Sequence, residues 1–189
     1  MTLIKTIAVL DANVLYPAPV RDILLNFADA KLFQPRWTKT IQEEWTRNLL
    51  ANRPDITEQA IGRTVKAMNI AFPDAEVTRY SEIINNLKLP DPDDRHVLAA
   101  AIKARATHIV TANTKDFPRK YVATHGVQIR HPDDFVRDLI KADFVTALLT
   151  FETMVSRLKN PPLSRKDVLA SLERCGMSNS VKLLAQITE

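Results

Sequence analysis

Residues 6–11 read TIAVLD, a short apolar run that ends in the carboxylate of Asp11. Both side-chain faces of this run are apolar or small, which indicates a strand buried on both faces of a sheet. Residues 19–32 then carry apolar side chains at helical spacing, and they predict a helix after this strand. Short apolar strands continue to alternate with helices along the chain. This alternation predicts an α/β fold, with a parallel β-sheet flanked by helices on both faces.

The remaining elements follow from the same patterns. Strands are expected at residues 32–33 (ended by Pro35), 75–78, 108–111 and 127–129, and helices over residues 41–49, 57–68, 83–87 and an Ala-rich segment that starts at Asp91-Pro92. One long helix is expected from Pro132 to about Leu158, where Asn160-Pro161-Pro162 breaks it. Ser164 and Asp167 then predict a capped helix that ends at Cys175-Gly176, and a last helix is expected over 179–187.

The chain is expected to divide into a main domain, residues 1–140, and a C-terminal helical extension, residues 141–189. The extension carries apolar side chains that favour packing on the main domain over a detached module. These side chains are Val168, Leu169, Leu172, Val181, Leu183 and Leu184.

Composition excludes several classes of protein. Among 189 residues there are only 3 Gly and a single Cys, so glycine-rich phosphate loops, internal disulfides and CxxC metal motifs are ruled out. Asp11 interrupts the first apolar run too early for a signal peptide, and no membrane-spanning run follows. A soluble protein of the reducing cytoplasm, with no membrane partner, is therefore expected. The net charge of +4 suits a polyanionic partner, although the excess is mild.

Two carboxylates are expected at one edge of the sheet. Asp11 ends the first strand, and Asp116 follows the strand at residues 108–111. Ligands of open parallel sheets bind beyond the carboxyl ends of the strands, so both acids are candidates for a site that binds hard cations. For either acid taken alone, a structural role in a helix cap or a turn is the favoured interpretation.

Helical phase separates the next pair of acids. Glu43 lies about 200° around the helix from Ile41, whereas Glu44 lies about 60° from it. Glu44 therefore flanks the buried face and Glu43 points outward. Phase decides only weakly between Asp93 and Asp94 at the start of the Ala-rich helix, and the larger side chains beneath Asp94 favour it. Acids at a helix start also complement the helix dipole, so a purely structural role remains open for both.

Taken in order, VLDANVL, the helix with Glu44, DPDDRHVLAAA and TANTKDF resemble the PIN-domain nucleases, in particular bacterial toxins of the VapC type. The resemblance covers about residues 5–140. The segment NPPLSRKDVLASLERCGM is similar to the helical extension of a longer subgroup of these toxins. The resemblance implies a divalent-metal-dependent endoribonuclease that cleaves RNA and acts as the toxin of a toxin–antitoxin pair. It also implies a cognate antitoxin protein as partner and is compatible with a homodimer.

The resemblance also assigns roles to residues of this chain. The catalytic and metal-binding acids would be Asp11, Glu44, Asp94 and Asp116, with Asp91 as an auxiliary metal ligand. Asn13, Thr111 and Asn113 match polar positions that orient these acids or a water molecule. Clustered carboxylates stay ionised only when a cation binds among them, and Mg²⁺ or Mn²⁺ prefers such oxygen ligands.

Other polar and aromatic residues near the acids are candidates for substrate binding. Cations that could hold the phosphates of single-stranded RNA are Lys39 and Arg47 near Glu44, and Lys115 and Arg119 beside Asp116. Trp37 and Trp45 could stack on bases, although the helical spacing of Trp45 favours the core. The histidines lack metal-ligand spacing and are expected at the surface or at helix ends; they are His96, His108, His125 and His131.

Two other functions fit parts of the sequence. The DANVL segment resembles the nucleophile motif of haloacid-dehalogenase-like phosphatases, but Asn13 replaces the second Asp and no GDxxxD motif follows. A non-catalytic PIN fold that binds another protein is the second alternative. Metal-dependent cleavage of RNA would separate all three functions.

Overall fold

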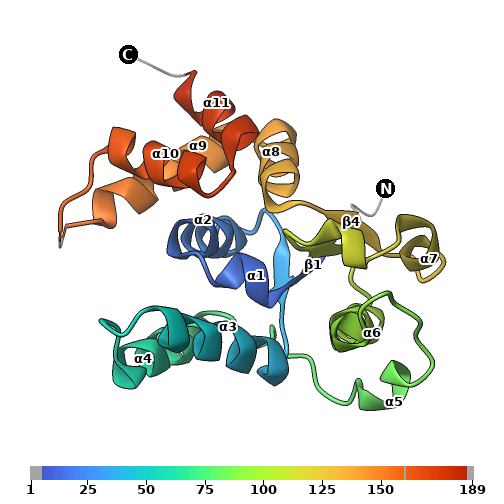
Figure 1. Cartoon of the computed structure of the whole chain (residues 1–189). Coiled ribbons are helices and arrows are strands. Elements are labelled where there is room, and N and C mark those ends of the chain that lie inside the picture. The colour runs from blue at the N-terminus through green and yellow to red at the C-terminus, as the bar shows by residue number, and fades with distance from the viewer. Residues whose placement is uncertain (1–5, 160, 187–189) are drawn as a thin grey trace.

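The computed structural model describes residues 6–159 and 161–186. Its centre is a four-stranded parallel sheet with the strand order β2-β1-β3-β4 (Figure 1). The strands are β1 (Ile7–Leu10), β2 (Gln34–Arg36), β3 (His108–Val110) and β4 (Gln128–Arg130). The helices are α1 (Ala12–Leu15), α2 (Ala18–Asp29), α3 (Lys39–Asn52), α4 (Glu58–Ala71), α5 (Ser81–Ile84), α6 (Arg95–Lys103), α7 (Arg119–Ala123), α8 (Pro132–Ala142), α9 (Phe144–Arg157), α10 (Arg165–Arg174) and α11 (Ser178–Ala185). Two 3-10 turns, η1 (Pro92–Asp94) and η2 (Thr114–Asp116), complete the chain. The predicted helix-flanked parallel α/β fold is confirmed.

β1 occupies the middle of the core, as its uninterrupted apolar sequence predicts. Ala8, Val9 and Leu10 have no exposed surface. β1 pairs in parallel with both β2 and β3, and the backbone N–H of Asp11 continues the ladder by donating to the carbonyl of Val110 at 3.1 Å. The carboxyl ends of β1 and β3 therefore meet at one edge of the sheet.

Two expected strands differ from the prediction. The strand expected at 32–33 begins two residues later, and Pro35, expected to end it, lies inside β2. Proline is tolerated there because β2 is an edge strand, paired with β1 alone among the described residues, and the missing N–H removes no bond from the interior of the sheet. The strand expected at 75–78 is reduced to one parallel bridge between Trp37 and Glu76.

The long helix expected from Pro132 to Leu158 is wrong, because two helices occupy this stretch. The backbone of Asp143 leaves the helical region (φ −145°, ψ 81°), which ends α8. Its carboxylate then accepts from the N–H of Thr146 at 3.1 Å and caps α9. Asp143 therefore begins a new helix. The helical spacing of the apolar side chains continues across this point, so it gives no sign of the break.

The C-terminal helices pack on the rest of the molecule. Figure 1 shows α2 between the α3–α4 pair on one side and α9 and α10 on the other. Val168 and Leu172 of α10 and Leu184 of α11 are buried, as the packing prediction requires. The predicted capping box of Ser164 and Asp167 is present, and Gly176 follows α10 with a φ of +79°, which glycine adopts without strain. Asn160, expected to help end a helix, and residue 187, expected to end another, lie outside the described residues.

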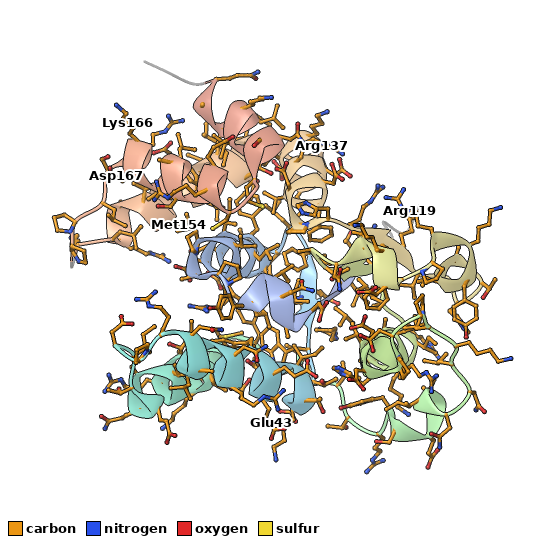
Figure 2. The ribbon with its side chains drawn as sticks, viewed as in Figure 1. Glu43, Arg119, Arg137, Met154, Lys166 and Asp167 are labelled. Atoms are coloured by element: carbon orange, nitrogen blue, oxygen red, sulfur yellow. The ribbon has the colours of Figure 1, made fainter. Side chains whose placement is uncertain are left out.

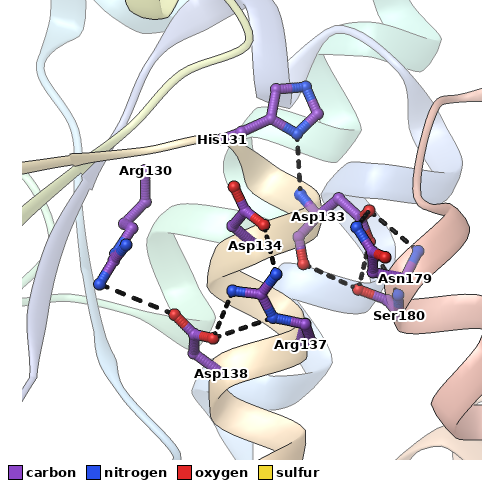
Figure 3. Close-up of polar contacts among 8 residues, drawn as sticks. All are labelled: Arg130, His131, Asp133, Asp134, Arg137, Asp138, Asn179 and Ser180. Carbon is purple, nitrogen blue, oxygen red and sulfur yellow. Dashed lines mark hydrogen bonds and ion pairs between the residues drawn. The ribbon is translucent and has the colours of Figure 1, made fainter.

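Asp133 of α8 joins the main domain to the last helix (Figure 3). Its buried carboxylate accepts from the backbone N–H and side chain of Asn179, at 3.0 and 2.9 Å, and from those of Ser180, at 2.8 and 2.7 Å. Burial alone would raise the pKa of Asp133, but these hydrogen bonds outweigh it and hold the pKa below its ordinary value. The first turn of α11 is thus fixed by an acid from another helix.

Both tryptophans belong to the core. Trp37 has no exposed surface and Trp45 is 1% exposed, so neither ring is available to stack on a base. The core position of Trp45 agrees with its helical spacing. Among the described residues, none of the helices has the length and apolar character needed to cross a bilayer.

Candidate active site

Asp11 is fixed in place at the end of β1. It forms the N-cap of α1, where one carboxylate oxygen accepts from the N–H of Ala12 at 2.7 Å. The other oxygen accepts from Asn13 Nδ2 and from Thr111 Oγ1, both at 2.7 Å. Burial raises the pKa of Asp11, and these hydrogen bonds oppose the rise without cancelling it. An acid that is buried yet firmly oriented is therefore presented at the edge of the sheet.

The polar residues predicted to orient the acids connect the ends of β1 and β3. Asn13 bonds to Asp11 through its Nδ2, while its Oδ1 accepts from the N–H of Ala112 at 2.9 Å. Thr111 Oγ1 donates to Asp11 and accepts from the N–H of Asn113 at 3.0 Å. The side chain of Asn113 in turn donates to Asp116 in η2. One hydrogen-bond network thus holds both strand-end acids.

Asp94 lies in the strongest negative field of the site. Its Oδ2 atom is buried and has no hydrogen-bond partner among the described residues. Burial and neighbouring carboxylates raise the pKa of Asp94 to about 7, and the positive charge of His96 opposes them. The carboxylates that act on it, in order of effect, are Asp11, Asp91 and Asp116. Three of the four predicted acids, and the auxiliary Asp91, are therefore close enough to repel one another.

Glu44 and Glu43 leave α3 in different directions, as their helical phase predicts. Glu44 is half-buried and faces the acids, and its charge contributes to the raised pKa of Asp11. Glu43 is exposed, points outward from α3 (Figure 2) and lies 3.5 Å from the Lys39 ammonium.

His96 is a site residue that the sequence did not reveal. The expectation of a surface or helix-end residue is right about its place in the first turn of α6 but wrong about its surroundings. Its side chain is only 12% exposed, and Nε2 lies 3.1 Å from Glu44 Oε1. Nδ1 is buried without a partner in the described chain. Sequence spacing could not show this contact because it joins α3 to α6.

An open cleft of about 450 Å³ lies between these elements. Its lining residues are Asp11, Ala12, Asn13, Tyr16, Glu44, Arg47, Asn48, Asn52, Asp93, Asp94 and His96. Of the four cations predicted to hold phosphates, Arg47 lines the cleft, whereas Lys39 turns to Glu43 and the exposed Lys115 and Arg119 are not part of the lining. Figure 2 shows Arg119 at α7, on the far side of the molecule from α3 and α4.

The donor chemistry of the site fits a divalent cation. Over residues 6–159 and 161–186, no three His, Cys, Asp or Glu side chains stand close enough together to form a complete metal site as they are placed. The acids nevertheless offer oxygen ligands, which a divalent cation prefers. The buried Asp94 Oδ2 forms no hydrogen bond, so a cation could bind it without breaking one. A cation would also relieve the repulsion that raises the pKa of Asp94.

Comparison with known proteins agrees with this geometry. Residues 7–115 match the family described as PIN domain, and residues 132–186 match the family described as VapC50 C-terminal domain. A protein of Mycobacterium tuberculosis (strain ATCC 25618 / H37Rv), named Putative ribonuclease VapC50, is 37% identical over 79 residues. These residues are 42% of this chain and 47% of that protein, so the match spans about half of the relative's length. No solved structure matches the chain.

The PIN match covers more than half of the chain and contains every predicted catalytic acid except Asp116, which follows it directly. The second match covers α8 to α11, the helices that follow the sheet. The chain is a member of the PIN domain family, with a C-terminal region of the VapC50 kind.

Proposed function

We propose that this protein is a divalent-metal-dependent endoribonuclease that acts as the toxin of a toxin–antitoxin pair. The observation that carries the proposal is the acid cluster at the carboxyl edge of the sheet, where Asp94 has a pKa of about 7 and an unbonded buried oxygen. Membership of the PIN family and the ribonuclease named among its relatives support it. An RNA substrate in the cytoplasm and a neutralising antitoxin protein are parts of the same proposal.

The cation would be Mg²⁺ or Mn²⁺, held by Asp11, Glu44, Asp94 and Asp116, with Asp91 nearby. Such an ion supplies positive charge beside the phosphodiester and lowers the pKa of water.

The protein's own contribution is to position these acids. Asn13 and Thr111 fix the direction of the Asp11 carboxylate, because their N–H and O–H groups donate to it. Asn113 donates to Asp116 and fixes its direction. Arg47, on the same cleft as Glu44, would bind a phosphate that flanks the one under attack.

The test is cleavage of a 5′-labelled single-stranded RNA with Mg²⁺ or Mn²⁺, and with EDTA as the metal-free control. Asp11→Asn and Asp94→Asn should each lower the rate by about 100-fold or more, because each removes a charged ligand worth several kcal/mol in the transition state. Asp134→Asn is the matched control, since this acid pairs with Arg137 on α8 and is not part of the cleft lining. Circular dichroism must show that all three variants are folded. Full activity of the Asp11 or Asp94 variant would remove that residue from the site.

The toxin role has its own test. Expression of the wild-type chain in bacteria should arrest growth, and expression of Asp11→Asn at the same level should not. Growth arrest by both forms would indicate an effect other than RNA cleavage.

A non-catalytic binding role is the second candidate, because the described side chains do not yet converge on one metal position. RNA that stays intact with every metal, together with unchanged melting temperatures on metal addition, would favour it. The phosphatase alternative loses its basis, since the chain belongs to the PIN family.

A further inference from the structure

The cleft lining contains two chemically different groups of residues. The first group consists of the acids Asp11, Glu44, Asp93 and Asp94, together with His96. The second group has no carboxylate and consists of Tyr16, at the end of α1, and Arg47, Asn48 and Asn52, along α3. α1 and α3 pack against each other (Figure 1), and these side chains line the same cleft.

The polar side chains of the second group have no partners within the described chain. The exposed Arg47 guanidinium forms no ion pair there, and the exposed Asn48 carboxamide forms no hydrogen bond. The hydroxyl of Tyr16 is likewise unbonded. The other two tyrosine hydroxyls are bonded: Tyr80 to Thr40 at 2.9 Å, and Tyr121 to the N–H of Lys88 at 3.0 Å. A cation, a carboxamide and a phenol hydroxyl thus line the cleft without a partner in the described chain, and the half-buried Tyr16 ring packs partly against the core.

The spacing of these groups suits a ligand that also reaches the acids. Asn48 follows Glu44 by one helical turn, a rise of about 6 Å. The cleft volume of about 450 Å³ falls in the range of small-molecule sites. A nucleotide carries the three features that the three side chains recognise: an anionic phosphate, a flat base and a base edge with adjacent donors and acceptors.

We propose that Tyr16, Arg47 and Asn48 form a subsite for the nucleotide next to the phosphodiester that is cut, and that this subsite selects the cleavage position in single-stranded RNA. The proposal rests on the ribonuclease function proposed above. Tyr16 stacks on the base, Asn48 pairs with the base edge through one donor and one acceptor, and Arg47 binds the adjoining phosphate. Asn52 lines the same cleft, but its Nδ2 donates to the backbone carbonyl of Asn48 at 2.9 Å. Asn52 is therefore not assigned to the base.

The first experiment measures selection. Wild type, Asn48→Ala and the control Asn69→Ala cut a pool of randomised single-stranded RNA, and the new ends are sequenced. Asn69 is a matched control because it is also an exposed helical asparagine and lies on α4, outside the cleft. Asn48→Ala should lower the base preference at one position beside the cut by about tenfold, within the range for loss of a paired base contact. Asn69→Ala should keep the wild-type preference. An unchanged preference in Asn48→Ala would overturn the assignment.

The second experiment measures binding without cleavage, so that it stays informative if the nuclease proposal fails. Fluorescence anisotropy of a labelled 12-nucleotide single-stranded RNA is followed with EDTA present. Tyr16→Leu should weaken binding about tenfold, as expected for loss of one stacked base, and Tyr16→Phe should restore most of it by keeping the ring. Equal affinities of wild type, Tyr16→Leu and Asn69→Ala would show that no base stacks here. Absence of cleavage with these binding differences intact would overturn the nuclease proposal and leave the subsite standing.

Discussion

The carboxyl group of Asp94 is expected to link the proposed metal binding to pH. Its pKa of about 7 lies above the ordinary value of 3.8, so the folded protein binds more protons than the unfolded chain between these values. Without metal, the free energy of unfolding should therefore fall as the pH rises from about 4 to 7, by the contribution of this group. A divalent ion competes with that proton. The rise in melting temperature caused by 5 mM Mn²⁺, taken as roughly a saturating concentration, should be larger at pH 8 than at pH 5.5.

Asp94→Asn is the control for this effect, because the amide holds no proton to release. Its metal-induced shift should be small at both values of pH. A wild-type shift that is equal at pH 5.5 and 8 would show that Asp94 does not lie beside the ion.

Glu44 and Glu43 provide a matched pair on one helix. Glu44→Gln should weaken metal-dependent cleavage by at least about tenfold, because it removes a charge that faces the acids while keeping the side-chain shape. Glu43→Gln should change the rate less than twofold, since Glu43 is exposed and its partner Lys39 lies at the surface. Metal titrations of the cleavage rate at fixed salt separate the two. A larger loss of cleavage rate in Glu43→Gln than in Glu44→Gln would mean that Glu43, not Glu44, contributes to the active site.

Among the helices, the contact between α8 and α11 holds the last helix in place. Asp133→Asn replaces an acceptor by a donor opposite the N–H groups of Asn179 and Ser180. The free energy of unfolding should fall by about 1.5–3 kcal/mol, the range for a hydrogen bond to a buried charge. Urea denaturation at pH 7 measures it. Because the pKa of Asp133 is lowered in the folded state, the wild type should lose this contribution as the pH falls below the ordinary value of 3.8.

Asp134→Asn is the neighbouring control. Asp134 pairs with Arg137 at 2.6 Å, but the pair lies at the surface of α8, so its loss should cost less than about 1 kcal/mol (Figure 3). Equal losses in the two variants would contradict the anchoring role of Asp133.

For the molecule as a whole, the C-terminal helices are expected to stabilise the sheet domain. A chain that ends at Leu158 loses α10 and α11 and exposes apolar side chains of α2 and α8 that they cover. Loss of one buried Leu-sized contact costs on the order of 2–5 kcal/mol, so the melting temperature should fall clearly. A chain that ends at Gln186 is the control. If the chain ending at Leu158 melted at the wild-type temperature, residues 159–189 would be a separate module rather than a packed extension.

Much of this molecule could be predicted because its signals are local. The apolar run of β1 determines a buried strand, and helical phase alone separates Glu44 from Glu43. The contact of His96 with Glu44 could not be predicted, since it depends on how α3 and α6 pack. Pro35 lies within a strand only because β2 is an edge, and Asp143 divides a helix whose apolar spacing gives no sign of a break. The division at residue 140 and the roles of the acids stay predictions.

The bond between Asp11 and Thr111 bears on how the protein is made. The two residues are 100 positions apart, so Asp11 is synthesised long before the residue that orients it. A chain growing on the ribosome would carry the first acid, then Glu44 and Asp94, without the strand and turn that complete the cluster. Under the proposed function, the protein would be unable to attack its own messenger RNA until translation has passed β3 and Asp116. The order of the acids along the chain would thus delay the proposed activity until most of the protein exists.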